Sequence, residues 1–449
     1  MSGDIPKGRL ARGLALVKLA SSQLPIVTQR IMKGEAAQLE LEAVKLSAEK
    51  AASVLGELRG LAMKVGQTAS YVDGLLPPEA SDVYQATLAK LQSAAPTVPF
   101  EALKAEIERG LGKPLDALYA RFDPEPLASA SIGQVHRAAI RDERGELVEV
   151  AVKVQYPAVA HAVASDLKNI ESLKPMLGIL APGADTSGGV DEVVRTLGEE
   201  LDYTIEARHQ KRFRALAEHF DGAYVARVYD SHTAPNVLTM EYVEGRSLRQ
   251  VCAEGDAALR DRVGEVIFRF TMGLAVARGV FNTDPHPGNY IIRPDGTVTF
   301  LDFGSVKQLP PELHGRWREL VELLLARRFD EWRERHAEMF GLGHMDPRAR
   351  EHHVRFMWST ATMVAADRPV TIDRDMLRGT FAHGLDTARA IGRDVGWMPS
   401  RARTVAMPPE FVMAGRMQLG LFAVLAHLRP TANWHRVLRE MLAWEHQEP

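Results

Sequence analysis

Three polar residues in one short stretch, Asp284, Asn289 and Asp302, constrain the fold of this chain more than any other feature. Between the second and the third, Tyr290–Arg293 and Val298–Leu301 have strand character and flank a Pro-Asp-Gly turn. This pattern predicts a β-hairpin. Because the two strands of a hairpin lie side by side, the residues just before and just after it meet at one end. The hairpin would therefore bring both carboxylates to one magnesium site.

The spacing of these residues is typical of phosphoryl-transfer chemistry. Asp284 and Asn289 have the Asp-x-x-x-x-Asn spacing of a kinase catalytic loop, in which the Asp accepts the proton of an attacking hydroxyl and the Asn holds a metal ion. Asp302 begins Asp-Phe-Gly, whose carboxylate binds the magnesium that bridges the phosphates of ATP. The alternative is a Pro/Gly-rich loop beside an ordinary buried aspartate. Both motifs in this order favour the kinase interpretation.

Length and composition exclude several classes of protein. A chain of 449 residues is too long for one compact domain, so two or three lobes are expected. The formal net charge of -3 provides no overall positive field for nucleic acid. The single cysteine, Cys252, excludes an internal disulfide and fits a reducing cytosol. No apolar run is long enough for a membrane span, and no secretory signal is evident.

The first segment is basic and has no acidic residue from Ile5 to Gly34. Leu10, Leu14 and Val17 fall near one helical face. Such a stretch can lie on an anionic membrane surface, act as an organelle transit peptide, or form a solvated first helix on the core. The sequence leaves these three interpretations open.

Helices are predicted over residues 35–62, near Pro78–Gln92 and over Phe100–Leu111, from the spacing of apolar residues and from the prolines that punctuate them. The first of these helices ends in Lys64-Val65-Gly66-Gln67. Taken alone, a Lys and a Gln around a Gly are an ordinary exposed helix end.

Short strands are predicted from Pro126 onward. Small residues lead into the first strand: Ala128, Ser129, Ala130 and Ser131. Kinases place a Gly-rich loop over ATP at this point, because small side chains let backbone amides approach the phosphates. Gly145 is predicted to turn a hairpin into the strand Val148–Val154. This strand contains Lys153, where kinases have the Lys that pairs with the α- and β-phosphates. Its apolar neighbours indicate that the ammonium points inward and needs an acidic partner. A surface Lys on an edge strand is the alternative.

A helix predicted from about Val190 to Phe220 carries candidate acids. Glu200, Asp202 and Glu206 cannot all share one face of a helix. Residues on the same face are three or four positions apart, whereas Asp202 and Glu206 follow Glu200 by two and six positions. They are therefore expected to have different partners. One of them would pair with Lys153, as the Glu of helix αC does in kinases.

A strand and hinge are predicted at Val237–Tyr242, where kinases hold the adenine ring against the backbone. Met240 is a candidate wall of that pocket, or else an ordinary core methionine. After Asp-Phe-Gly, Pro310-Pro311-Glu312 begins a helix at once, with no Ala-Pro-Glu motif. The platform that binds peptide substrates in protein kinases is therefore missing or rebuilt. The remainder is predicted to be helical, with four tryptophans in the core or an interface: Trp317, Trp332, Trp358 and Trp434.

A set of motifs between Lys64 and Gly304 carries a family resemblance. They are Lys64–Gln67, Ala128–His136, Ala151–Pro157, Glu200–Tyr203, Asp284–Asn289 and Asp302–Gly304. As a set they are specific, and they resemble the UbiB/AarF family of atypical kinases, which includes coenzyme Q accessory proteins of mitochondria and bacteria.

The resemblance implies a fold and a role for each motif. The fold would be α+β, a two-lobed protein-kinase-like fold with an N-terminal helical extension. Lys64 and Gln67 match a Lys-x-Gly-Gln motif that folds over the cleft, and Glu200 and Asp202 match a Glu-x-Asp motif that faces the extension. Glu206 then becomes the better partner for Lys153. Family members bind ATP with Mg²⁺, have ATPase activity, and support isoprenoid-lipid biosynthesis at membranes.

Three departures from the family pattern bear on these expectations. Ser129 adds a hydroxyl to a loop that is Ala-rich in the family, which puts the preference between ATP and ADP in question. Asn282 stands where many bacterial members have His, at a position that supports the catalytic loop. The membrane-spanning tail of some bacterial members is absent, so any membrane contact is expected to be peripheral.

The sequence thus predicts four segments. They are a basic N-terminal segment (1–34), a helical extension (35–120), a kinase-like N-lobe (121–242) and a helical C-lobe (243–449). The predicted function is an ATP- and Mg²⁺-dependent atypical kinase or ATPase in ubiquinone or related isoprenoid-lipid biosynthesis, with a small-molecule or lipid acceptor. One alternative is a nucleotide-binding pseudokinase scaffold. Another is a phosphotransferase of the aminoglycoside or choline kinase type, which the Lys64–Gln67 motif disfavours.

The expected partners are the nucleotide, an isoprenoid or quinone precursor and an anionic membrane surface. The expected location is the cytoplasm or the inner membrane face, or the mitochondrial matrix if the N-terminus is a transit peptide.

Overall fold

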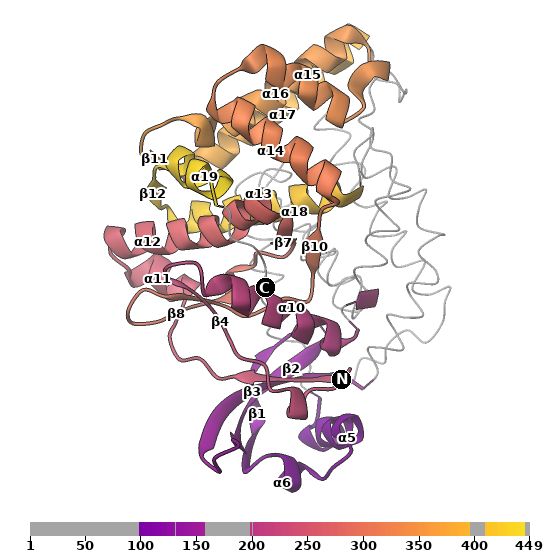
Figure 1. Ribbon diagram of the computed structural model, residues 1–449, viewed down its shortest axis with the longest axis vertical. Coiled ribbons are helices and arrows are strands. Elements are labelled where there is room, and N and C mark those ends of the chain that lie inside the picture. Colours follow the sequence, from indigo (N-terminus) through magenta and orange to yellow (C-terminus); the bar gives the residue numbers. More distant parts are fainter. Residues whose placement is uncertain (1–97, 131, 158–197, 200, 396–408, 445–449) are drawn as a thin grey trace, which may run out of the picture. The chain divides into compact units, whose positions relative to one another are not determined.

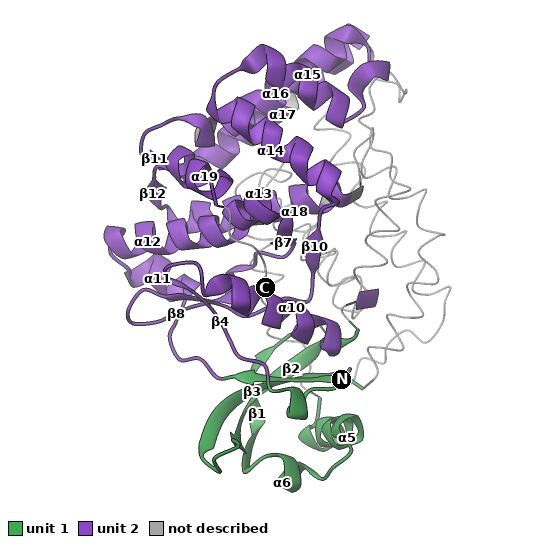
Figure 2. Cartoon of the chain, in the orientation of Figure 1, with its two compact units in different colours: residues 1–181, 201–203, 229–241 green, residues 182–200, 204–228, 242–449 purple. Residues whose placement is uncertain are grey.

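The computed structural model describes residues 98–130, 132–157, 198–199, 201–395 and 409–444, drawn as ribbons in Figure 1. The chain divides into two compact units, which Figure 2 distinguishes by colour. Unit 1 comprises residues 1–181, 201–203 and 229–241. Unit 2 comprises residues 182–200, 204–228 and 242–449.

Unit 1 is built on an antiparallel sheet with the strand order β1-β2-β3-β5. The strands are β1 (Arg121–Ser129), β2 (Gly133–Arg141), β3 (Leu147–Gln155) and β5 (Val237–Glu241). In the β2–β3 turn, Asp142 Oδ1 accepts hydrogen bonds from the backbone N–H groups of Arg144 and Glu146, both at 2.9 Å. Gly145 has a φ of 78°, which only a residue without Cβ adopts at no steric cost. The predicted hairpin around Gly145 is confirmed.

Two helices precede the sheet, α5 (Phe100–Leu111) and α6 (Leu115–Leu118). The bounds of α5 are those predicted from the sequence. Leu103 and Ile107, one turn apart, are fully buried, and α5 packs on β3 and β5. The helix ends where Gly112 turns left-handed and donates its N–H to the carbonyl of Glu108 at 2.8 Å.

Unit 2 is mainly helical in its described part. Its helices are α10 (Tyr203–Ala217, whose first residue belongs to unit 1), α11 (Leu248–Glu254), α12 (Ala257–Phe268), α13 (Leu274–Arg278), α14 (Pro311–Leu325), α15 (Phe329–Met339), α16 (Pro347–Ala365), α17 (Arg374–Val395), α18 (Pro409–Leu428) and α19 (Trp434–Leu442). A π-helical turn, Arg269–Gly273, joins α12 to α13.

Short strands complete unit 2. They are β4 (Ala223–Val225), β6 (Arg246–Ser247), β7 (Val280–Asn282), β8 (Tyr290–Ile292), β9 (Val298–Phe300), β10 (Val306–Gln308), β11 (Val370–Thr371) and β12 (Thr431–Ala432). They form one sheet in the order β4-β9-β8-β6 and two pairs, β7–β10 and β11–β12. The predicted hairpin after the catalytic loop is β8–β9, and it is confirmed.

The core of unit 2 surrounds α12 and α13. Phe268 packs against Trp434 with ring centroids 4.9 Å apart, and Trp434 Nε1 donates to the carbonyl of Val370 at 2.8 Å. Trp317 and Trp332 are also buried, and Trp358 packs partly buried against the same core. The predicted placement of these four tryptophans is therefore confirmed.

The structure corrects the sequence prediction in three places. The helix predicted from Val190 to Phe220 is interrupted, because Leu201 and Asp202 are not helical and α10 begins at Tyr203. The loop predicted to contain Ala128 and Ser129 starts later, since both residues belong to β1, which pairs with β2 to its end. The short pairs β7–β10 and β11–β12 were not predicted.

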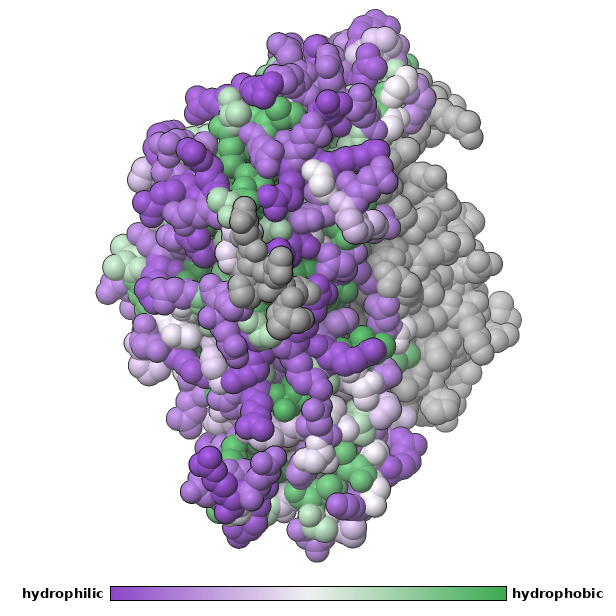
Figure 3. Space-filling view, viewed as in Figure 1, coloured by the Kyte–Doolittle hydropathy of each residue, from purple (hydrophilic) through white to green (hydrophobic). Residues whose placement is uncertain are grey.

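The surface of the described residues is largely polar, and hydrophilic side chains cover most of the described area visible in Figure 3. Large apolar side chains are exposed at three described positions: Leu127, Leu147 and Leu419. Among the described helices, none is both long and apolar enough to cross a membrane. The predicted segment 1–34 and the helices over 35–62 and Pro78–Gln92 lie outside the described residues.

Close packing in unit 2 predicts opposite effects for two glycine substitutions in helices. A Cβ at Gly264 of α12 would lie 2.3 Å from Pro430 Cβ, whereas a Cβ at Gly315 of α14 would meet nothing within 4 Å. We expect Gly264→Ala to lower the thermal unfolding temperature, because overpacking costs about 1–3 kcal/mol. Gly315→Ala should raise it slightly, since Ala favours a helix by about 1 kcal/mol over Gly. Scanning calorimetry of both variants measures this difference, and equal stability would contradict the packing described.

Candidate active site

Two strand pairs hold the two predicted loops at both ends. The loop with Asp284 runs from the end of β7 to the start of β8, and Asp302 lies between β9 and β10. β8 pairs with β9, and β7 pairs with β10. Beyond the β8–β9 ladder, the N–H of Leu301 donates to the carbonyl of Asn289 at 3.1 Å. Asn289 therefore lies opposite Leu301 across the hairpin, and Asp302 is the next residue after Leu301. In Figure 1, β7 and β10 lie beside each other below α13 and α18.

The backbone of Asp284 is fixed by two asparagines. Its N–H donates to Asn282 Oδ1 at 3.0 Å, and its carbonyl accepts from Asn289 Nδ2 at 3.1 Å. The Asp284 carboxylate contacts Arg416 of α18. Both predicted loop residues, Asp284 and Asn289, are thus locked together within one short segment.

Asn282 connects the catalytic loop to the Asp-Phe-Gly segment. While its Oδ1 accepts from Asp284, its Nδ2 donates to the carbonyl oxygen of Asp302 at 2.5 Å. The sequence predicted that this position supports the loop, and these contacts are the physical form of that support. A second link is the buried pair of hydroxyls on Thr283 and Ser305.

The Asp-Phe-Gly segment is anchored to α10. Asp302 Oδ1 accepts from the N–H of Gly304 at 2.9 Å, which orients the carboxylate. Phe303 is buried and packs on Phe213 with ring centroids 4.9 Å apart. His209 Nδ1 donates to the carbonyl of Phe303 at 3.2 Å, and burial lowers the pKa of His209. A neutral imidazole is sufficient for this bond, so α10 holds the segment without an added charge.

His286 lies between Asp284 and Asn289 in the sequence, and its surroundings favour the neutral imidazole. Burial lowers its pKa, an effect that the negative charges of Asp284 and Asp302 oppose. Its Nδ1 accepts a hydrogen bond from the N–H of Gly288 at 2.8 Å, which requires an unprotonated nitrogen. The lowered pKa and the hydrogen bond agree on a neutral His286.

The side chains in these loops suit a hard divalent cation. Asp302 and Asn289 offer carboxylate and amide oxygens, the donors that magnesium prefers. The strand pairing places them at one end of the β8–β9 hairpin. No cluster of three or more His, Cys, Asp or Glu side chains with metal-binding geometry occurs among the described residues. The oxygens of Asp302 and Asn289 fit the chemistry of a magnesium ion, which proteins usually bind through one or two side chains together with phosphates and water.

Unit 1 holds the predicted phosphate-binding residues. Lys153 lies near the end of β3, opposite Leu238 of β5, with its Nζ 5.0 Å from the centre of the Tyr203 ring. Met240 is buried in β5 opposite Ala151. The N–H of Ala130 donates to the carbonyl of Gly133 at 2.8 Å and closes the β1–β2 turn. Ala128 and Ser129 are exposed at the end of β1.

Several predicted residues are not brought together by the structure. Lys64, Gln67, Ser131 and Glu200 lie outside the described residues, and Asp202 lies in the turn before α10. Glu206 is buried in α10 within unit 2, whereas Lys153 belongs to unit 1. The pairing of Lys153 with Glu206, and a nucleotide site formed by both units, stay predictions.

Sequence reasoning missed three contacts in unit 2. Glu199 forms an ion pair with Lys307, which is 6% exposed and follows Asp-Phe-Gly in β10, at 3.2 Å. Arg416 contacts Asp284, and Gly420 of α18 packs on Pro285. An inward-facing Lys in a short strand is a weak signal for the first contact. Nothing in the local sequence around Arg416 points to the catalytic loop.

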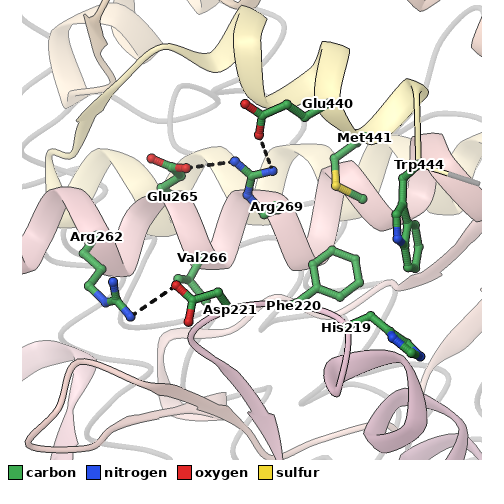
Figure 4. Close-up of a pocket in the computed structure, with 10 residues that line it drawn as sticks. All are labelled: His219, Phe220, Asp221, Arg262, Glu265, Val266, Arg269, Glu440, Met441 and Trp444. Carbon is green, nitrogen blue, oxygen red and sulfur yellow. Dashed lines mark hydrogen bonds and ion pairs between the residues drawn. The ribbon is translucent and has the colours of Figure 1, made fainter. Parts of the chain in front are cut away.

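A separate pocket of about 560 Å³ lies in unit 2 between α12, α19 and the residues after α10 (Figure 4). Its apolar side chains include Phe220, Met441 and Trp444. At the rim, Arg269 bonds to Glu265 and Glu440, as the dashed lines in Figure 4 mark. The Arg269–Glu440 pair joins the end of α12 to α19. No residue of the Asp284 or Asp302 loops lines this pocket.

A profile of the ABC1 atypical kinase-like domain matches residues 90–336, a segment that contains every site residue placed above except Arg416 and Gly420. The chain belongs to this family. The predicted relationship to UbiB/AarF-type atypical kinases and the predicted kinase-like fold are both confirmed.

Individual relatives agree with the family. The chain is 35% identical over 254 residues to the chloroplastic protein ACTIVITY OF BC1 COMPLEX KINASE 3 of Arabidopsis thaliana, over 56% of this chain and 35% of that protein. It is 29% identical over 318 residues to the mitochondrial atypical kinase coq-8 of Caenorhabditis elegans, over 67% of this chain and 41% of that protein. The matches thus span less than half the length of these relatives.

One solved structure is similar to this chain over almost the full length of both. It is that of Rv3197 from Mycobacterium tuberculosis in complex with erythromycin, with a TM-score of 0.61 and 28% identity. The similarity covers 91% of this chain and 98% of that chain.

The double role of Asn282 predicts that its loss affects ligand binding as well as stability. Asn282→Ala removes the bonds to Asp284 and Asp302, and we expect a loss of about 1–3 kcal/mol in stability together with a smaller thermal shift on addition of MgATP. Asn433 is a matched control, because it also accepts from a backbone N–H and donates to an oxygen, at the start of α19. Asn433→Ala should lose similar stability and keep the ligand shift. Equal ligand shifts in both variants would argue against the bridging role.

Proposed function

We propose that this protein binds ATP with magnesium and catalyses transfer of the γ-phosphoryl group, as an atypical kinase or ATPase. The observation that carries the proposal is the pair of strand ladders, β7–β10 and β8–β9, which fix Asp284, Asn289 and Asp302 in one region of unit 2. Family membership adds support, because relatives are named as kinases. Magnesium, when bound, would neutralise the charge that develops on the phosphates.

Each residue would have a distinct role in this reaction. Asn289 and Asp302 would hold the metal ion through their side-chain oxygens. Asp284 would accept the proton of the attacking hydroxyl or water. Lys153, with the turn between β1 and β2, would hold the phosphates, and Glu206 would orient Lys153. Asn282 would keep the two loops at a fixed separation.

The acceptor is proposed to be a small molecule or a lipid, and not a peptide. Only the short segment Ser305–Pro310, which includes β10, separates Asp-Phe-Gly from α14. This leaves no length for the activation segment on which protein kinases bind peptides. A role in ubiquinone or related isoprenoid-lipid biosynthesis is part of the proposal and follows from the family resemblance. The competing proposal is a pseudokinase scaffold, which would bind the nucleotide without turnover.

The proposal predicts that the MgATP response depends on Asp302. Saturating MgATP at about 100 times its dissociation constant should stabilise the native protein by about 2.7 kcal/mol. For Asp302→Asn we expect this thermal shift to collapse, because the carboxylate that holds the metal is lost. Asp295→Asn is the control, since Asp295 is exposed in the turn of the same β8–β9 hairpin. A normal MgATP shift in Asp302→Asn would place the metal site elsewhere.

A further inference from the structure

An arginine from the C-terminal part of the chain contacts the predicted catalytic base. Arg416 Nη2, on α18, donates to Asp284 Oδ1 at 3.2 Å. The Arg416 side chain is 21% exposed and that of Asp284 is 30% exposed, so both are partly accessible to solvent. Arg416 lies outside the segment matched by the family profile, residues 90–336.

Among the described residues, Arg416 uses little of its hydrogen-bonding capacity. A guanidinium has five N–H donors. Within the part of the chain that the structure describes, the single bond to Asp284 Oδ1 is the only hydrogen bond or ion pair of this side chain. An arginine that served only to neutralise an aspartate would gain most from a two-bond, fork-like contact. Here the contact is a single bond, and donors remain for another anion.

The helix that carries Arg416 is packed directly on the catalytic loop. One turn after Arg416, Gly420 faces Pro285, and a Cβ at Gly420 would lie 2.8 Å from Pro285 Cγ. Buried residues such as Met417 and Leu421 hold a neighbouring side of α18 in the core of unit 2. The position of Arg416 beside Asp284 is therefore set by helix packing and not by the ion pair alone.

The place of Arg416 relative to the reaction follows from the role of Asp284. In phosphoryl transfer the attacking and leaving oxygens lie roughly in line, and the catalytic Asp contacts the attacking hydroxyl. A cation that touches this Asp is therefore on the side of the acceptor, away from the leaving nucleotide. Arginine binds carboxylate and phosphate groups with two parallel hydrogen bonds.

We propose that Arg416 forms an anion subsite for the acceptor, so that the acceptor carries a phosphate or carboxylate group near its hydroxyl. This inference rests on the proposed function and names the acceptor class for the same site. In the absence of the acceptor, Asp284 occupies one donor of Arg416. When the anionic group binds, Arg416 holds it and leaves the Asp284 carboxylate to face the hydroxyl.

The test is calorimetric titration of the full-length protein, saturated with magnesium and a non-hydrolysable ATP analogue so that the nucleotide site is filled. Glycerol 3-phosphate is the soluble probe, with glycerol as its neutral counterpart. Vesicles of phosphatidylglycerol in phosphatidylcholine are the lipid probe, with pure phosphatidylcholine as the counterpart. We expect one anionic probe to bind, and Arg416→Gln to weaken that binding about tenfold or more. Arg416→Lys should lie between the two.

Two further variants separate this inference from a structural role. Asp284→Asn removes the carboxylate that competes for Arg416, so it should retain or strengthen binding of the anionic probe. If the ion pair were only structural, Asp284→Asn and Arg416→Gln would change binding in the same direction. Arg262→Gln is the matched control, because Arg262 also has one carboxylate partner, Asp221 at 3.7 Å, on the rim of the separate pocket. It should bind the probes as the wild type does.

The outcomes assign the source of the anion or overturn the inference. Arg416-dependent binding of glycerol 3-phosphate supports a soluble acceptor. Arg416-dependent binding of phosphatidylglycerol vesicles alone supports a lipid acceptor, and exposed Leu419, three residues further on α18, is then expected to contribute. Binding of neither anionic probe, or equal binding by wild type and Arg416→Gln, overturns the subsite. A protein that fails to bind the nucleotide contradicts the proposed function instead, and the same titrations without nucleotide still decide the role of Arg416.

Discussion

The placement of the candidate site depends on two pairs of three-residue strands. The ladders β7–β10 and β8–β9 close both ends of the Asp284 loop and of the Asp-Phe-Gly segment. Neither loop can slide past its neighbour without breaking the hydrogen bonds of a strand pair, because the register of each pair is fixed residue by residue. Asn282, the last residue of β7, adds a bond to each loop. The geometry of the site is thus a backbone property that side chains reinforce.

Three helices then fix what surrounds these loops in unit 2. From α10, His209 and Phe213 hold Phe303. From α18, Gly420 packs on Pro285 and Arg416 reaches Asp284. After the short strand β10, the chain leaves the site and enters α14.

Local signals made much of this structure predictable. Two short runs of β-branched and aromatic residues on either side of Pro-Asp-Gly predicted the β8–β9 hairpin, and proline and glycine residues at its ends predicted the bounds of α5. The β7–β10 pair could not be predicted, because three-residue strands carry no periodicity and their partners are set by the tertiary fold. The break at Leu201 and Asp202 was missed because helical spacing continues through it. Arg416 is separated from Asp284 by 132 residues, and no local pattern encodes such a contact.

The central claim is that Asp284 is the base of a magnesium-dependent phosphoryl transfer from ATP. The most direct test is the initial rate at which γ-labelled ATP loses its terminal phosphate, to water or to an acceptor, in wild type and in Asp284→Asn. A positioned general base contributes about 10²–10⁴-fold to a rate. We therefore expect turnover that requires Mg²⁺ and falls by about 100-fold or more in Asp284→Asn. Turnover that is equal in both proteins, or a wild type that binds MgATP without turnover, would contradict the claim, and the second result would favour a scaffold.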